Sequence, residues 1–206
     1  MFVYKTDEEL FVKGKLEENL RVVEKASRNT ESFVNASFAM QGIQQALSDD
    51  RQMPHVLLGC WRLCEASGYL QSLTLLLNME ESEDNDEEDE DNDDDERVNI
   101  ILNAMITLLS DKAERFRDRM LALTLTEESA IALIESLKRS LTEENTTVKY
   151  IHCTIAFLEQ PSNVPLIIAA CNSLGGVADI FGTAARFYQG NADLVRAIDK
   201  VTQTLQ

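Results

Sequence analysis

The sequence predicts an all-helical protein, and three observations support this fold class. In the last segment, apolar residues recur at the spacing of one helix face: Leu194, Ile198, Val201 and Leu205. Only eight glycines and three prolines occur in 206 residues, and alternating strand patterns are scarce, which disfavours a sandwich or barrel. Residues 164–206 contain three such segments, and similar groups recur upstream. One group cannot bury its own apolar stripes, so we expect the groups to stack.

The first part of the chain contains several helix signals. Thr6 to Glu9 has the form of a capping box, followed by a short helix to about Gly14 and a second from Leu16. Further helical patterns cover residues 31–47, with a turn expected at Gly42. Pro54 starts another helix, because a proline at the first helical position loses no hydrogen bond. Residues 69–77 form a compact apolar segment after Gly68.

The second part repeats these patterns. A helix is expected from Arg97, a second after the N-cap residue Thr126, and a third over Thr147 to Gln160, which Pro161 closes. The helices that we take as the last of each group begin near residues 16, 54, 97, 147 and 193. Their spacing of 38 to 50 residues is close to the ~40–47 residues of repeats built from two or three helices.

An acidic segment interrupts this pattern. Residues 80–96 contain fourteen Asp or Glu and no Lys or Arg, so most of the net charge of −17 lies here. Like charges without apolar residues cannot collapse into a core. We therefore predict that 79–96 is a disordered acidic loop, inserted between the second and third helices of one unit.

The arrangement of helices and glycines resembles the armadillo-repeat family. Its unit has a short first helix, a glycine-led second helix and a long third helix. Asn172 to Ile180 is similar to the glycine-led entry, Gln41-Gly42-Ile43 matches it again, and Gly68-Tyr69-Leu70 does so less completely. Thr126-Glu127-Glu128 departs from the pattern, so that unit could be HEAT-like. The resemblance implies a right-handed α-solenoid, with residues 1–206 forming one array of about four to five units.

The resemblance also implies that the third helices line a groove that holds a partner peptide. Nuclear-import adaptors of the family carry a Trp, and four residues later an Asn, on successive third helices. Here only Trp61 fits, and Glu65 stands in place of the Asn, so we expect no conventional receptor for nuclear-localisation signals. The candidate partner-binding residues are Trp61, Arg62, Glu65, Asn103, Thr107, His152, Arg196, Lys200 and Gln203, together with Arg21 and Glu24.

Several residues have two interpretations. Cys60 and Cys64, with His55 before them, lack the spacing of a zinc site and fit core positions better. Trp61 fits the core better than an exposed groove, although a groove aromatic would anchor a peptide. The basic segment 112–119 fits a solvated helix face, or a patch that pairs with the acidic segment or with an acidic partner.

We therefore expect a non-enzymatic scaffold or adaptor that binds another protein, without cofactor or metal. One alternative is that the acidic segment binds a basic protein, as a chaperone or a regulated adaptor would. Another is a fragment of a larger armadillo-repeat cytoskeletal or transport protein. Self-association through the C-terminal helix 193–206 is a further option, because its stripe ends the chain. No basic stripe for nucleic acid, membrane span or secretory signal is found, so we expect a cytoplasmic location, with the nucleus or cytoskeleton as alternatives.

Overall fold

The computed structural model describes residues 6–49, 52–78, 90–109 and 124–206, and every element in these ranges is helical. The elements are α1 (Asp7–Ala26), α2 (Phe33–Ser48), α3 (Pro54–Ala66), α4 (Tyr69–Leu76), α5 (Glu90–Leu109), α7 (Glu127–Arg139), α8 (Glu144–Leu158), the 3-10 helix η1 (Pro161–Asn163), α9 (Val164–Ser173), α10 (Val177–Phe187) and α11 (Ala192–Leu205). The all-helical prediction is confirmed for these ranges.

Side-chain caps fix several helix starts as the sequence predicted. The Thr6 hydroxyl accepts the backbone N–H of Glu9 at 3.1 Å, and the Glu9 carboxylate accepts the N–H of Thr6 at 3.3 Å, which completes the capping box. Thr126 caps α7 by accepting the Ser129 N–H at 3.1 Å. Each cap pairs N–H groups that have no partner within the helix.

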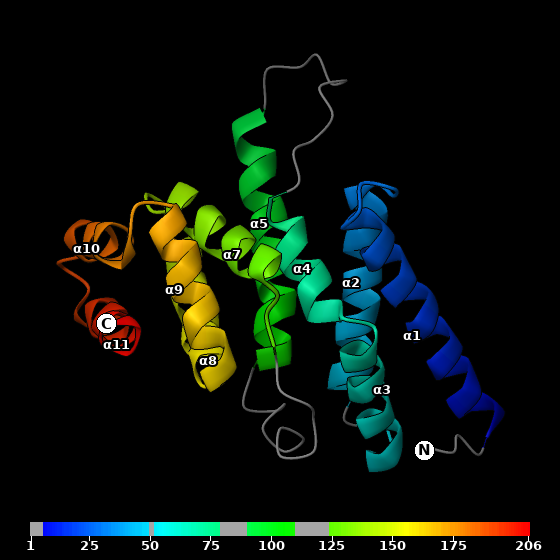
Figure 1. Cartoon of the computed structure of the whole chain (residues 1–206). Helices are drawn as coiled ribbons and strands as arrows, with labels where there is room; N and C mark the ends of the chain where they lie inside the picture. The colour runs from blue at the N-terminus through cyan, green and yellow to red at the C-terminus, as the bar shows by residue number, and fades with distance from the viewer. Residues whose placement is uncertain (1–5, 50–51, 79–89, 110–123) are drawn as a thin grey trace.

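The helices pack in two rows, which Figure 1 shows running from the N-terminal to the C-terminal end of the molecule. One row is α2, α5, α8 and α11, in which each helix contacts the next. The other begins with α1, α4 and α7, and continues through α9 to α10. Cross-row contacts join α1 to α2, α4 to α5, α7 to α8 and α10 to α11, so the described residues form four such pairs.

One continuous core runs between the rows, from Leu16 on α1 to Leu205 on α11. Its largest fully buried side chains include Trp61, Tyr150 and Phe157. Because adjacent pairs share this core, each pair buries apolar surface that it would expose alone. The ends of the chain lie at opposite ends of the molecule (Figure 1).

Two predicted breaks at glycines are wrong. α1 continues through Gly14, and α2 continues through Gly42. Gly42 lies beside α1, and a Cβ atom there would come within 2.4 Å of Nδ2 of Asn19, so the Asn19 side chain occupies the space that the glycine leaves. By contrast, Gly68 and Gly176 have φ values of 66° and 101°, so the predicted turns at these positions are confirmed.

The assignment of third helices needs a correction at the N-terminal end. The segments from 16 and 54 belong to α1 and α3, neither of which is in the row of α5, α8 and α11. That position belongs to α2, which the sequence pattern divided at Gly42. α5 begins at Glu90, earlier than the predicted Arg97, so residues 90–96 of the proposed acidic loop are helical. The rest of that loop, 79–89, and the basic segment 112–119 lie outside the described residues.

The C-terminal helix does not present an open apolar stripe. Ile198, Val201 and Leu205 are at most 4% exposed, because α11 packs on α8, α9 and α10 of the same chain. A second copy or a partner therefore cannot use this stripe without displacing the helix. Any self-association through 193–206 would have to use its polar outer side.

Within the described residues, none of the individual helices combines the length and the apolar character that crossing a membrane requires.

Candidate protein-binding surface

We call the row of α2, α5, α8 and α11 the long row. Among its described side chains, the large hydrophobic ones that are exposed lie on α2. Val34 is 62% exposed and Phe38 is 67% exposed, one turn apart on the same side of the helix. Gln41, Gln45 and Ser48 continue this exposed stripe at spacings of three and four residues. The opposite side packs into the core through Ile43 and its neighbours. We call the stripe from Val34 to Ser48 the α2 face.

The α2 face also lacks charge. None of the sixteen residues of α2 is Asp, Glu, Lys or Arg, although 27% of the whole chain is charged. Exposed helix faces are normally kept soluble by charged side chains. An exposed aromatic residue on a surface without charges is instead the composition found at the centre of protein interfaces.

The next helices of the row expose most of the residues chosen from the sequence. On α5, Asn103 is exposed and Thr107 is half-buried, and the Thr107 hydroxyl donates to the Asn103 carbonyl at 2.9 Å. On α8, His152 is exposed. The Lys149 ammonium donates to Oδ1 of Asn99 at 2.7 Å, which ties α8 to α5. Asn103 and His152 are thus exposed on two helices that contact each other.

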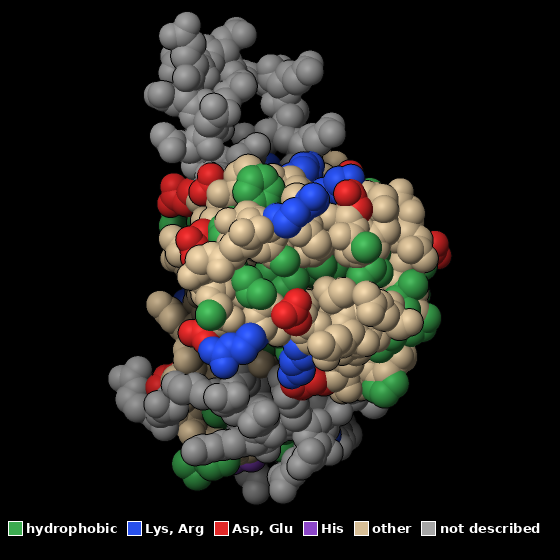
Figure 2. All heavy atoms as spheres, turned by 90° about the vertical axis from the view of Figure 1, so that its left-hand side faces the viewer, with side chains coloured by type: hydrophobic (Ala, Val, Ile, Leu, Met, Phe, Trp, Pro, Cys, Tyr) green, Lys and Arg blue, Asp and Glu red, His purple; other side chains and the backbone are tan. Residues whose placement is uncertain are grey.

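α11 ends the row with a polar outer side. Arg196, Lys200 and Gln203 are all exposed, as predicted from the helical phase. Arg196 pairs with Asp193 one turn earlier. Figure 2 views this end of the molecule, where charged and polar side chains border the hydrophobic ones. The outer side of α11 is therefore a polar surface that water can solvate.

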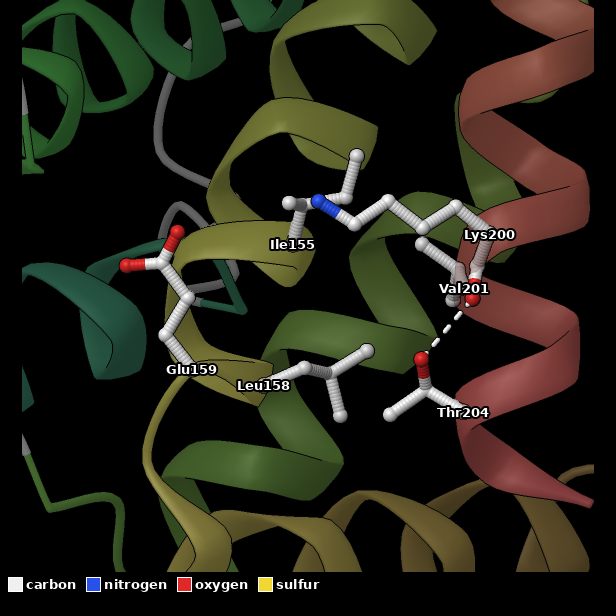
Figure 3. A pocket seen from close by; sticks show the side chains of 6 residues that line it. All are labelled: Ile155, Leu158, Glu159, Lys200, Val201 and Thr204. Carbon is white, nitrogen blue, oxygen red and sulfur yellow. Dashed lines mark hydrogen bonds between the residues drawn. The ribbon is translucent and has the colours of Figure 1, made fainter.

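A shallow groove separates α8 from α11, and Figure 3 shows the side chains that line it. Ile155 and Leu158 on α8 supply its accessible apolar surface, and Val201 on α11 lies buried beside it. Lys200 reaches across from α11 toward Ile155. The groove is open to solvent, and its cavity volume is about 80 Å³. This is well below the ~300–1,000 Å³ of small-molecule sites and leaves room for no more than one side chain of a peptide.

The other predicted residues lie elsewhere. Trp61, Arg62 and Glu65 are on α3, outside the long row, and Trp61 is only 2% exposed. Arg21 and Glu24 are on α1. Trp61 is therefore a core residue, and its indole cannot anchor a partner on the surface. The structure does not bring these five residues together with those on α5, α8 and α11.

The cysteines are core residues, as the sequence favoured. All four are free and buried. Burial raises the pKa of Cys60 and of Cys171 to about 11, and that of Cys153 to about 12, since a thiolate loses its hydration in the core. His55 does not join them, because its Nε2 lies 3.0 Å from a carboxylate oxygen of Glu9 and connects α3 to α1. The described residues contain no metal-binding group of three or more His, Cys, Asp or Glu.

Side chains of α7 hold the point at which the chain leaves α4 for the acidic segment. Arg139 donates to Oδ1 of Asn78 at 2.6 Å and to the Leu77 carbonyl at 3.2 Å. The Asn78 amide donates to Glu135 at 2.7 Å. These bonds fix the end of α4 independently of the residues that follow it.

The sequence interpretation missed the α2 face. A signal for it was present, since the run from Phe33 to Ser48 has no charge, and Val34 and Phe38 lie off the stripe that Ala36, Met40 and Ile43 form. Dividing the run at Gly42 hid this pattern. Comparison of the chain with protein-family models, with curated protein sequences and with solved structures found no match.

Proposed function

We propose that the chain is a non-enzymatic, armadillo-like scaffold that binds another protein along the outer side of α2, α5, α8 and α11. The serial contacts along two rows support the array, since each helix pair touches mainly its neighbours. In this view α2, α5, α8 and α11 correspond to the third helices of four units. The outer side of such a row offers a long surface made of side chains from several helices.

The observation that carries this proposal is the α2 face. Leaving Phe38 two-thirds exposed forgoes the burial of an aromatic ring, which is worth about 1.5–3 kcal/mol. A partner that covers Phe38 and Val34 recovers this energy without having to desolvate a charge on α2. Aromatic side chains in such positions are frequent binding hot spots.

The test compares two exposed aromatic residues. Phe38→Ser removes the centre of the α2 face, while Phe187→Ser removes a ring that is 58% exposed on α10, outside the long row. Partners recovered by affinity purification are quantified by mass spectrometry for both variants and the unchanged chain. We expect Phe38→Ser to lose a specific set of partners that Phe187→Ser retains. Equal recovery with both variants would reject the α2 face as the binding surface.

A second candidate function rests on the acidic segment, whose charge would attract a basic protein. The anchoring of Asn78 by α7 supports a clean test of it. A flexible Gly-Ser linker replaces residues 79–89 only, because α5 begins at Glu90. Loss of partners with this variant, but not with Phe38→Ser, would favour the acidic segment. The opposite result would favour the α2 face.

A further inference from the structure

The groove between α8 and α11 combines an apolar floor with an unneutralised positive charge. Ile155 and Leu158, which are half-buried on α8, form this floor, whereas Val201 on α11 is fully buried. The Lys200 side chain lies over this surface, as Figure 3 shows. Among the described residues, its ammonium has no ion-pair partner, whereas the neighbouring Arg196 pairs with Asp193.

From this arrangement we propose that the α8–α11 groove binds an extended peptide segment in which an apolar side chain stands next to an acidic one. The inference rests on the proposed function and names the chemistry of the partner at this end of the row. The apolar side chain would pack against Ile155 and Leu158, and the carboxylate would meet Lys200. Neither contact alone suffices, since an exposed ion pair contributes about 0–1 kcal/mol and the groove is shallow.

The other polar groups of the groove fit this occupant. The Thr204 hydroxyl is already used, because it donates to the backbone carbonyl of Lys200 at 2.9 Å. Glu159 lies on the far side of α8 from Lys200, and its carboxylate points away from the ammonium (Figure 3). The carboxylate of the peptide is thus drawn to the α11 side of the groove, where it does not meet Glu159. This asymmetry favours one direction of binding.

The volume also excludes bulkier occupants. A cavity of about 80 Å³ accepts at most one aliphatic side chain, with the peptide backbone outside it. A helix of a second copy would need a longer apolar surface than Ile155 and Leu158 supply. An extended peptide lets the same partner continue along the row toward α5 and the α2 face.

The experiment uses the full chain and three synthetic peptides as probes. The first alternates Leu and Glu, the second has Lys in place of Glu, and the third reproduces the acidic segment 80–96, which has no apolar residue. Binding is followed by amide shifts in ¹⁵N-labelled protein, which report both the affinity and the site. We expect the Leu-Glu peptide to shift the amides of α8 and α11 around Ile155 and Lys200, with little effect from the other two.

A charge reversal gives the decisive comparison. Lys200→Glu should weaken the Leu-Glu peptide about fivefold to tenfold and strengthen the Leu-Lys peptide. Lys15→Glu, an equal charge change at an exposed position of α1, should leave both affinities unchanged. The proposal is overturned if the Leu-Glu peptide does not bind, binds elsewhere or ignores Lys200→Glu, or if the acidic peptide binds as tightly. In those cases, loss of partners with Phe38→Ser would still support the proposed function, so the two proposals can fail independently.

Discussion

The two end helices of the long row, α2 and α11, expose different kinds of side chain to solvent. At the C-terminal end, α11 buries its whole apolar stripe and exposes Asp193, Arg196, Asp199, Lys200, Gln203 and Thr204. At the N-terminal end, α2 buries a similar stripe but exposes Val34 and Phe38 on a helix without charges. Both ends are helical and well packed, so packing does not explain the difference. The two helices therefore differ in the surface that they offer to solvent, and a partner on α2, as proposed above, would cover the apolar one.

Replacing a hydrophobic residue by Asp should therefore change the stability of the fold very differently at the two ends of the row. Ile198→Asp places a charge in the core between α11 and α8, and we expect it to lower the free energy of unfolding by about 3–5 kcal/mol. Phe38→Asp changes a side chain that is already in water, so its effect on stability should stay within about 0.5 kcal/mol. Urea unfolding followed by circular dichroism measures both values.

Hydrogen exchange then tests whether the packing is serial. In the Ile198→Asp variant, exchange should rise in α8 to α11 and remain unchanged in α1 to α4, because the damaged helix touches only its neighbours. A uniform rise across the chain would contradict the array and indicate one cooperative unit.

Removing the hydroxyl group from each of two buried tyrosines should change the stability in opposite directions, and by less than Ile198→Asp does. The Tyr188 hydroxyl donates to the Leu141 carbonyl at 2.7 Å, so Tyr188→Phe leaves that carbonyl without this donor and should cost about 1–2 kcal/mol. Within the part of the chain that the structure describes, the buried Tyr69 hydroxyl has no hydrogen-bond partner, so Tyr69→Phe should be neutral or stabilising by up to about 1 kcal/mol. Thermal melts of the two variants provide the comparison. A loss of stability in Tyr69→Phe would show that its hydroxyl is bonded.

The core cysteines should make the free energy of unfolding sensitive to alkaline pH. The pKa values of Cys60 and Cys171 rise from 9.0 to about 11 in the fold, so between these values the unfolded chain releases protons that the folded chain keeps. Stability should be greatest below pH 9 and fall as the pH rises toward 11. Cys171→Ala should reduce this fall, measured as unfolding midpoints at pH 8 and pH 10.5. An unchanged slope would show that the Cys171 thiol does not titrate as its burial implies.

The fold was largely predictable because helix signals are local. The capping box at Thr6, the start at Pro54, the turn at Gly68 and the stripe of α11 follow from residues close together in the sequence. The row to which a helix belongs depends on contacts between distant residues, which the pattern does not contain. Gly42 illustrates this, since a glycine at a turn and a glycine inside a helix look alike in sequence.

The candidate surface was predictable only in part for the same reason. Helical phase was enough to place Asn103, His152 and Arg196 on exposed sides of α5, α8 and α11. The phase did not reveal that α3 lies outside their row, so Trp61 was grouped with them although it is buried. Nor does a single sequence show which apolar residues remain exposed. Val34 and Phe38 became candidates only when their positions on α2 could be compared with the core.

Site-specific photo-crosslinking shows directly whether a partner covers the α2 face. A benzophenone amino acid replaces Phe38 on the α2 face in one protein and Phe187 on α10 in another, and both are irradiated with their partners present. Both positions are well exposed, so the probe is equally able to react at either. If the α2 face binds a partner, we expect a discrete crosslinked product at position 38 and none at position 187. A partner captured at position 187 alone, or the same products at both positions, would contradict it.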